Sequence, residues 1–214
     1  MTKSVSDFIN EYNESGDYAN LFEQLYVQTT ANDSAPPWVK HQAHPHLTAW
    51  ADKSKLSGTG KRAMVVGCGL GDDAEYLAKL GFNVTAFDVS ATAITICERR
   101  FPQSDVAYVH ADLFAMPQDW QQAFDFVFES RTIQALPSNI SEKSIAAIAS
   151  LVARDGTLLL LCHGRDPQES IAGIPWSLSR KELQAFSENH LEELEFDDVP
   201  EGNGRFFRVV YRRT

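Results

Sequence analysis

The sequence predicts one α/β domain in which a parallel sheet carries helices on both faces and ends in an antiparallel hairpin. Two observations support this fold class. Between residues 63 and 162, short apolar runs alternate with segments of helical spacing, a pattern typical of a parallel sheet with right-handed crossovers. The last two apolar runs, Leu191–Phe196 and Phe206–Tyr211, have no helix between them but a turn rich in Asp, Pro, Gly and Asn. We expect these two runs to pair as a hairpin.

Ahead of this alternation, the N-terminal residues have helical character. The apolar positions of residues 1–28 have helical spacing that is interrupted near Gly16, which indicates two short helices. Thr29–Pro37 is polar and bounded by proline, so we expect a loop there. Pro45–Leu56 is expected to form a further helix that leads to a Ser-Gly-Thr-Gly turn.

The alternating region contains the strands of the sheet and the helices that cover it. Its apolar runs predict strands at residues 63–66, 83–87, 106–110, 124–128 and 157–162. The helical spacing between and after these runs predicts helices at residues 72–80, 91–99, 141–152 and 179–188. Because strands and helices alternate, the carboxyl ends of the strands should share one edge, where ligands bind in such sheets.

Composition narrows the possible functions. A length of 214 residues suits one well-buried domain, and no apolar run has the length of a membrane span. The formal charge of −10 disfavours phosphate backbones, so we expect neither nucleic acid nor membrane as a partner. The first ten residues lack the basic start and apolar core of a signal peptide, which makes the cytoplasm the expected location. The three cysteines are widely spaced and indicate no disulfide framework.

A glycine-rich turn follows the first strand and marks the expected ligand site. Gly67, Gly69 and Gly71 stand at alternate positions, with Cys68 between the first two, and this spacing lets a turn run close to a ligand. Asp88 ends the second strand, 21 positions after Gly67. A carboxylate at that place is typical of a site that binds the two ribose hydroxyls of a nucleoside.

The residues after the turn distinguish between nucleoside cofactors. A dinucleotide site places a diphosphate at the helix N-terminus, but Asp72 and Asp73 occupy that position here and would repel it. They suit a cationic or zwitterionic ligand, and S-adenosylmethionine (SAM) carries a sulfonium and an α-amino group. We therefore expect SAM as the cofactor. An NAD(P)-dependent oxidoreductase remains the first alternative.

With these motifs, the chain resembles the class I SAM-dependent methyltransferases over about residues 60–165. The resemblance implies a Rossmann-like sheet that closes with the antiparallel hairpin. It also implies that the glycine turn, Asp73 and the pair Asp88-Val89 bind the cofactor, and that Asp112 and the backbone of Leu113 bind its adenine. A plain loop cap is the alternative role for Asp112.

The ends of the fourth and fifth strands supply the candidates for catalysis and acceptor binding. Glu129 ends the fourth strand, where it could hold the methionine amino group or deprotonate an acceptor; a solvated strand end is the alternative. His163 is the second catalytic candidate, with an ordinary hydrogen-bonded histidine as the alternative. Arg131, Arg165 and Trp176 are expected to contact the acceptor, although Trp176 also suits a core position.

Scattered positions extend the resemblance to the thiopurine and thiol/halide methyltransferases. The shared features are Gly-Cys-Gly followed by an acid at Asp73, the sequence Asp88-Val-Ser90, and Pro37-Trp38 with a further proline at Pro45. In those enzymes the tryptophan region folds over the cofactor, so Trp38 is expected to contact both cofactor and acceptor. Residues 29–47 are expected to form a mobile lid. The chain departs from the pattern at Val39, His41 and Glu129.

His41, His44 and His46 have metal-like spacing before the first strand. No nearby Cys or acid completes a set of ligands, and Pro45 disrupts any helix that would align them. We therefore expect no metal. The segment is assigned to a lid or to a loop in which His41 contacts substrate.

Together these residues favour a SAM-dependent methyltransferase that moves a methyl group to an N, O or S atom of a small-molecule acceptor by in-line displacement. Such an enzyme needs alignment and exclusion of water more than an acid or a base. In this interpretation residues 1–56 are a helical cover, residues 60–165 the cofactor-binding core and residues 164–178 an insertion at the acceptor site. A non-catalytic interaction protein of the same fold is the second alternative.

Overall fold

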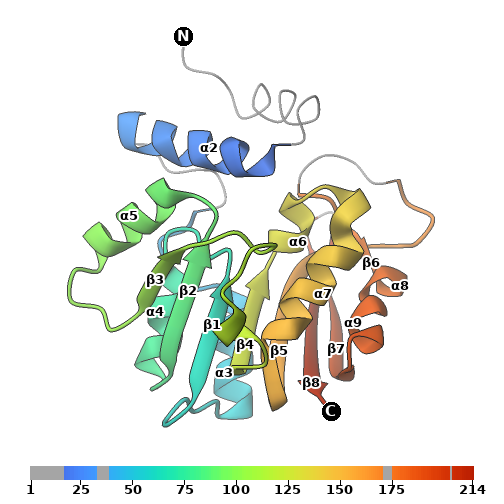
Figure 1. Cartoon of the computed structure of the whole chain (residues 1–214). Helices are drawn as coiled ribbons and strands as arrows, with labels where there is room; N and C mark the ends of the chain where they lie inside the picture. Colours follow the sequence, from blue (N-terminus) through green and yellow to red (C-terminus); the bar gives the residue numbers. More distant parts are fainter. Residues whose placement is uncertain (1–16, 33–38, 171–174, 203) are drawn as a thin grey trace.

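The computed structural model describes residues 17–32, 39–170, 175–202 and 204–214, and an eight-stranded sheet forms its centre (Figure 1). The strands follow the order β3-β2-β1-β4-β5-β8-β7, and β6 pairs with β5 outside this order. Their bounds are β1 Arg62–Val66, β2 Asn83–Asp88, β3 Ala107–His110, β4 Phe124–Ser130, β5 Val152–Arg165, β6 Leu178–Ser179, β7 Leu191–Glu201 and β8 Gly204–Arg213. The strands from β3 to β5 are parallel, whereas β8 is antiparallel to both β5 and β7. The predicted sheet with its closing hairpin is therefore confirmed.

Helices cover both faces of this sheet (Figure 1). Their bounds are α2 Tyr18–Asn32, α3 Pro45–Ser54, α4 Asp72–Lys79, α5 Ala91–Arg100, α6 Thr132–Ala135, α7 Ser141–Leu151, α8 Arg180–Leu183 and α9 Ala185–Glu188. The helices α3, α4 and α5 contribute buried residues to one apolar layer, and α6 to α9 contribute to the other. None of the described helices combines the length and apolar character that a bilayer crossing requires.

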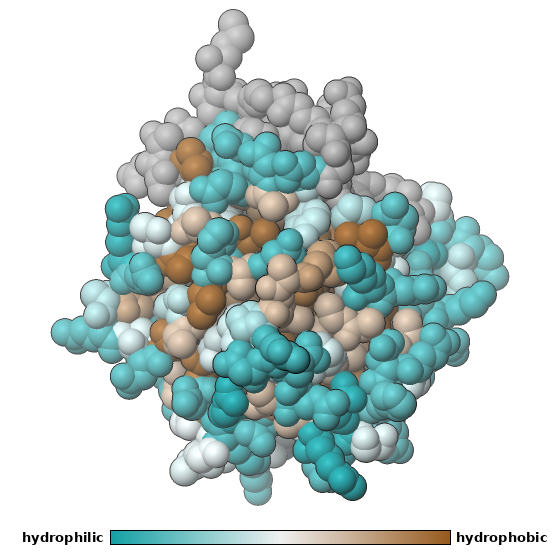
Figure 2. Space-filling model, viewed as in Figure 1, coloured by the Kyte–Doolittle hydropathy of each residue, from teal (hydrophilic) through white to brown (hydrophobic). Residues whose placement is uncertain are grey.

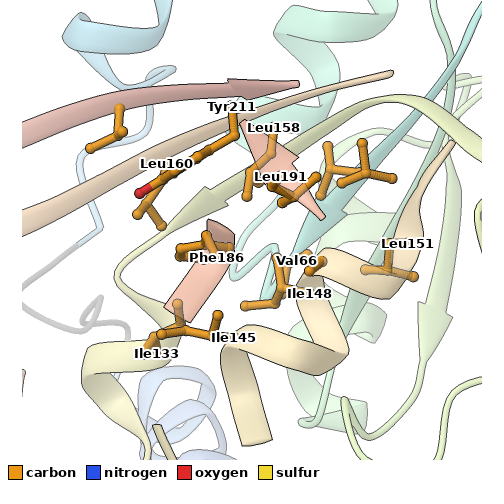
Figure 3. Close-up of a cluster of buried hydrophobic side chains, with 14 of the residues drawn as sticks. Val66, Ile133, Ile145, Ile148, Leu151, Leu158, Leu160, Phe186, Leu191 and Tyr211 are labelled. Atoms are coloured by element: carbon orange, nitrogen blue, oxygen red, sulfur yellow. The ribbon is translucent and has the colours of Figure 1, made fainter. Parts of the chain in front are cut away.

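Alternation along the strands divides the core between the two faces. Met64 and Val66 of β1 point into the layer of α7, while Ala63 and Val65 point into the layer of α3 to α5. Figure 3 shows the first layer, in which Ile148 of α7 packs among side chains of the sheet. Each large aliphatic side chain buried in this way stabilises the fold by about 1.5–3 kcal/mol.

The N-terminal elements differ in part from their prediction. Residues 29–32 belong to α2, although the sequence predicts a loop from Thr29 onward. Because these four residues include neither glycine nor proline, nothing in them stops the helix. The remainder of that loop and the helix predicted before Gly16 lie outside the described residues. The predicted helix at 45–56 is present as α3.

Other boundaries and elements also differ from the prediction. β5 begins at Val152 rather than at Thr157, since it pairs with β4 through a register shift between Phe124 and Phe126. The helix predicted at residues 179–188 is divided at Gln184 into α8 and α9. Helix α6 and strand β6 have four and two residues and are too short to show a period in sequence.

The closing hairpin brings a late part of the chain to the edge where the parallel strands end. Because β8 is antiparallel to β5, its first residues lie beside the last residues of β5, and Phe206 is paired directly with His163. This edge also contains the turn after β1 and the ends of β2 and β4. The candidate site is built there.

Candidate active site

The turn between β1 and α4 has the backbone geometry that its glycines predict. Gly67, Gly69 and Gly71 have φ values of +59°, +55° and +87°, a region that L side chains rarely adopt. A Cβ at Gly67 would also collide with the side chain of Thr132, and a Cβ at Gly71 would lie 2.5 Å from the Tyr108 hydroxyl. The sequence predicts room for a ligand beside these glycines. At Gly67 and Gly71 that space belongs to the chain's own side chains.

Asp88 lies across from the turn and is 6% exposed. Its carboxylate accepts hydrogen bonds from the backbone N–H groups of Gly69, at 2.9 Å, and Ser90, at 3.0 Å. Burial raises the pKa of Asp88 to about 6, although these hydrogen bonds lower it. Since a carboxylate has about four lone pairs, Asp88 retains acceptor capacity for hydroxyl groups while it joins the end of β2 to the turn.

Three neighbouring residues predicted to bind the cofactor have a side chain or a carbonyl group that already contacts another part of the protein. The Cys68 thiol is buried, and the carbonyl of the adjacent Gly69 accepts a hydrogen bond of 3.2 Å from the Cys97 thiol of α5. The carbonyl of Val89 lies 3.1 Å from Nε2 of His110. Leu113 is 6% exposed and packs in the apolar layer of α7. For Cys68 and Leu113, the prediction therefore concerns backbone groups rather than side chains.

The two acids at the start of α4 have different surroundings. Asp72 forms a bidentate ion pair with Arg100, with distances of 2.9 and 2.8 Å. Asp73 accepts a hydrogen bond of 2.7 Å from the backbone N–H of His44, and burial raises its pKa to about 6. The prediction that both acids face a cationic ligand is wrong for Asp72, because Arg100 neutralises it. Asp73 remains as the acid beside the turn.

Asp112 is contacted by a helix that is distant in sequence. The hydroxyl of Tyr18 lies 2.9 Å from both carboxylate oxygens, and the backbone N–H of Phe114 donates to Oδ1 at 2.9 Å. The loop-cap role left open for Asp112 is thus present in the structure. The same helix, α2, lies above the ends of the strands in Figure 1.

A cluster of rings stands at the ends of β5 and β8, and we call His44, His46, His163 and Phe206 the histidine cluster. The rings of His44 and His46 stack on Phe206 with centroids 5.3 and 4.8 Å away, and His163 meets it edge-on at 5.6 Å. Burial lowers the pKa of His44 to about 4, with smaller contributions from nearby positive charge. His44 is therefore neutral at neutral pH. In the described residues, no three His, Cys, Asp or Glu side chains are grouped to hold a metal ion.

Arg131 lies between this cluster and the glycine turn. It has a positive φ of +64°, a strained conformation for a non-glycine residue. Its charge lowers the pKa of both His44 and Asp73, so the guanidinium is near these two groups. It is half-buried, and among the described residues no side chain forms an ion pair with it. The prediction that Arg131 contacts an acceptor is compatible with this position.

Glu129 has no exposed surface. One carboxylate oxygen accepts hydrogen bonds from the backbone N–H groups of Thr132 and Ile133 at the start of α6, and the other has no partner within the described residues. Burial raises the pKa of Glu129 to about 7. The solvated strand end considered from the sequence is wrong, because the carboxyl group is fully buried. Glu129 holds the turn that carries Arg131, and its contact with the methionine amino group or with an acceptor stays a prediction.

Two residues predicted to contact the acceptor have structural roles. The guanidinium of Arg165 forms an ion pair with Glu182 at 2.9 Å and donates to several backbone carbonyls, including that of Ser177. Trp176 is 2% exposed, and its indole N–H donates to the carbonyl of Leu136 at 2.7 Å. Both predictions are therefore corrected, since the two side chains are buried and their N–H groups are already engaged in hydrogen bonds within the protein.

The structure gives less detail on the surroundings of the remaining predicted residues, His163, His41 and Trp38. His163 is half-buried in the histidine cluster, and its backbone N–H donates to Oε1 of Gln134 at 2.8 Å. His41 is exposed and takes no part in the ring contacts of the cluster. Trp38 lies outside the described residues. The roles of His163 and His41 toward an acceptor stay predictions.

Several residues of this edge are not among the sequence candidates. Phe206 could have been found, because an antiparallel last strand must begin at this edge. Gln134 is fully buried and binds backbone groups of His163 and Trp176, so it joins α6 to the end of β5. Tyr18 and Glu23 of α2 reach residues 94 and 67 positions away, and no local pattern indicates such contacts.

A model of the thiopurine S-methyltransferase family matches residues 28–211. The chain belongs to this family. It is 27% identical over 187 residues to the thiopurine S-methyltransferase of Shewanella amazonensis, with 78% of this chain and 85% of that protein covered. It is 30% identical over 128 residues to the ubiquinone biosynthesis O-methyltransferase of Aromatoleum aromaticum, covering 59% of this chain and about half, 53%, of that protein.

The fold of this thiopurine S-methyltransferase family member is shared with solved methyltransferases. One is the 1,6-didemethyltoxoflavin-N1-methyltransferase of Burkholderia thailandensis, solved with S-adenosylhomocysteine (SAH), which aligns with a TM-score of 0.65 and 16% identity over 98% of this chain and 87% of that one. Its family membership makes the chain a SAM-dependent methyltransferase. The family assignment removes the oxidoreductase and the non-catalytic protein as alternatives. Buried acids beside a glycine turn fit a ligand that offers hydroxyl and ammonium donors.

Proposed function

We propose that this enzyme methylates a small-molecule acceptor bound between the glycine turn and the histidine cluster. The observation that carries the proposal is the position of His44. Its backbone N–H donates to Asp73 at 2.7 Å, and its ring stacks on Phe206 at 5.3 Å. One residue thus joins an acid of the cofactor turn to the wall of rings, and a molecule between them would meet both.

The cofactor would be held by groups at the ends of three strands. We assign the backbone of the glycine turn and Asp73 to the methionine part, Asp88 and Val89 to the ribose, and Asp112 with the Leu113 backbone to the adenine. When bound, SAM supplies an electrophilic methyl group. The chain's own contribution is to orient the ligands and to exclude water.

On the acceptor side, we assign a base to His163 and an orienting charge to Arg131. An uncharged imidazole can take the proton from an S–H, O–H or N–H acceptor as the new bond to carbon forms. The guanidinium of Arg131 favours the deprotonated form of that acceptor, because a positive charge stabilises a nearby anion. Glu129 and Gln134 are positioning residues: Glu129 holds the backbone of α6, and Gln134 holds the backbone of His163.

Sulfur is the acceptor atom to be tested first. The family and the Shewanella relative are named for S-methylation, while the Aromatoleum relative is named for O-methylation. A sulfur acceptor also agrees with the small catalytic apparatus, because a thiolate is a strong nucleophile that needs little activation. The contact of Trp38 with cofactor and acceptor stays a prediction from the sequence, because Trp38 lies outside the described residues.

The experiment uses methyl-labelled SAM with separate pools of small thiols, phenols and amines. We expect labelled S-methyl product from the thiol pool. The variant His163→Ala should lower kcat by about a hundredfold while the Kd for SAH stays within about twofold. His190→Ala is the matched control, since His190 is exposed and precedes β7 at the opposite edge of the sheet. Normal turnover in His163→Ala would contradict the assignment of the base.

A further inference from the structure

Helix α2 crosses the carboxyl edge of the sheet and touches the loops after β2 and β3 (Figure 1). We propose that Tyr18 and Glu23 of this helix are positioning residues for the cofactor, Tyr18 by orienting Asp112 toward the adenine amino group and Glu23 by fixing the loop that carries Asp88. This inference rests on the cofactor assignment made above. It adds a segment from outside the sheet to the cofactor site.

The contact of Tyr18 orients the carboxylate of Asp112 without using all of its capacity to accept hydrogen bonds. The hydroxyl lies 2.9 Å from each oxygen of Asp112, while the Phe114 N–H donates to Oδ1 at 2.9 Å. The Tyr18 ring is itself fixed by an edge-on contact with Phe114 at 6.1 Å. Because a carboxylate accepts about four hydrogen bonds, these contacts leave capacity on Oδ2. An amino group on adenine is a donor that can use it.

The contact of Glu23 reaches Asp88 through one residue. The Glu23 carboxylate accepts hydrogen bonds from the Ser90 hydroxyl at 2.7 Å and from the hydroxyl and N–H of Thr92, the latter at 3.2 Å. The N–H of Ser90 in turn donates to Oδ1 of Asp88 at 3.0 Å. Burial raises the pKa of Glu23, but the hydrogen bonds from Thr92 and Ser90 outweigh burial and hold it below its ordinary value. Glu23 is therefore an anion at neutral pH.

Apolar residues of α2 pack the helix and thereby fix the positions of Tyr18 and Glu23. Leu21, Leu25 and Tyr26 are 4%, 7% and 3% exposed, and Tyr26 packs with Leu70 of the turn and Ala93 of α5. In Figure 2 the residues along α2 that face the viewer are mostly hydrophilic. Among the described residues, it is Tyr26 that packs the helix onto the turn and α5 at this edge. Groups on such an element can be held before the ligand arrives, which favours binding.

The test compares SAH with S-inosylhomocysteine, in which a keto oxygen replaces the adenine amino group. For the wild-type protein we expect SAH to bind more tightly, since the keto oxygen cannot donate to Asp112. In Tyr18→Phe, the Kd for SAH should rise by about three- to tenfold, and the Kd for S-inosylhomocysteine should change by less than about twofold. Titration calorimetry measures both. The loss of discrimination is the decisive result, because general weakening of the fold would affect both ligands alike.

Two further variants complete the test. Glu23→Gln should weaken both ligands by about the same factor, roughly threefold, because Glu23 acts on the ribose loop and not on adenine. Tyr76→Phe on α4 is the matched control and should leave both values unchanged.

An unchanged ratio in Tyr18→Phe, or tighter SAH binding, would overturn the inference while the cofactor assignment stood. A wild-type protein that bound neither ligand would overturn both.

Discussion

At the residue scale, Asp88 illustrates how one side chain serves both the fold and the site. Its carboxylate accepts hydrogen bonds from the N–H groups of Gly69 and Ser90, so it holds the glycine turn at the end of β2. The same group faces the position assigned to ribose. A substitution there should therefore affect stability and binding together, and the two effects can be separated by the choice of variant.

Asp88→Ala should weaken SAH binding by at least about tenfold, because two ribose hydroxyls would lose their acceptor at about 1–3 kcal/mol for an unpaired group. It should also lower the melting temperature, since two buried N–H groups lose their partner. Asp88→Asn is the control that keeps the shape and one acceptor oxygen. Calorimetry that found equal SAH affinity in wild-type protein and Asp88→Ala would contradict the ribose assignment.

The raised pKa values of Asp73 and Asp88 predict a pH dependence of binding. Burial raises each to about 6, so both are ionised at neutral pH and become protonated as the pH falls through about 6. Hydroxyl and ammonium donors bind the ionised forms, so SAH affinity should fall below that pH. The stability of the free protein has the opposite pH dependence and falls as the pH rises, because ionising a carboxyl whose pKa is raised by folding destabilises the folded state.

The measurement is the Kd for SAH at pH values of about 5 and about 7.5, with an expected loss of roughly tenfold or more at the lower value. His44 does not obscure the result, because its pKa is lowered to about 4 by burial. An affinity that was constant across this range would mean that neither carboxylate contacts the ligand.

Glu129 predicts a second pH effect, this time on stability. Burial raises its pKa from 4.5 to about 7, so the wild-type protein loses stability as the pH rises from about 4.5 through about 7. Glu129→Gln cannot ionise and avoids this loss. We expect the variant to gain about 1–3 kcal/mol relative to wild type between pH about 4.5 and about 8. Denaturant unfolding at both values measures the difference, and a constant difference would show that Glu129 keeps an ordinary pKa.

At the scale of elements, α2 should be a stable part of the protein without cofactor. The packing of Tyr26 against Ala93 and the hydrogen bonds of Glu23 hold it on α5. In hydrogen exchange of the free protein, amides in the described part of α2 should therefore exchange slowly. Glu23→Gln should speed their exchange while amides of β1 keep their protection. Fast exchange across α2 in the wild type would contradict a fixed base for the cofactor contacts.

The mobile lid predicted for residues 29–47 must be shortened at its C-terminal end. His44 is bonded to Asp73 and stacked on Phe206, and Leu47 is fully buried. These contacts fix the entry to α3, so a closing motion that includes residues 44–47 is not expected. Trp38 lies outside the described residues, and its closure over the cofactor stays a prediction.

Comparison of these elements with their prediction shows where local pattern is sufficient. The strands β1, β2 and β4 are apolar runs whose period and length are visible in sequence, and the Gly67–Gly71 turn is marked by residue types that positive φ requires. The long β5 is different, because its first residues pair with β4 only through a register shift. Such pairing depends on contacts between distant segments, which periodicity does not report.

At the scale of the whole molecule, the candidate site depends on segments that converge from both ends of the chain. The ends of β1, β2 and β3 are predictable because a parallel sheet places them on one edge. The sequence also places Arg165 and Trp176 there, yet packing gives both of them structural roles. Whether a polar side chain faces ligand or core depends on its neighbours in space, and a single sequence does not supply them.

The fold also explains how an acidic protein presents a site of mixed charge. The formal charge is −10, but Asp72, Asp197 and Glu182 are paired with arginines. At the carboxyl edge, Asp88 is bonded to the glycine turn, whereas Asp73 lies near Arg131 and accepts a hydrogen bond from the backbone of His44, whose ring is uncharged. A cationic cofactor and an acceptor that becomes anionic during reaction can therefore have separate partners within one site.

The most direct test of the account is a crystal structure with SAH bound. It should show the ribose hydroxyls on Asp88, the adenine amino group on Asp112, the methionine amino group near Asp73, and the sulfur facing the histidine cluster. SAH in this place with its sulfur turned away from His163 and Arg131 would contradict the proposed acceptor site. SAH bound away from the glycine turn would contradict the account as a whole.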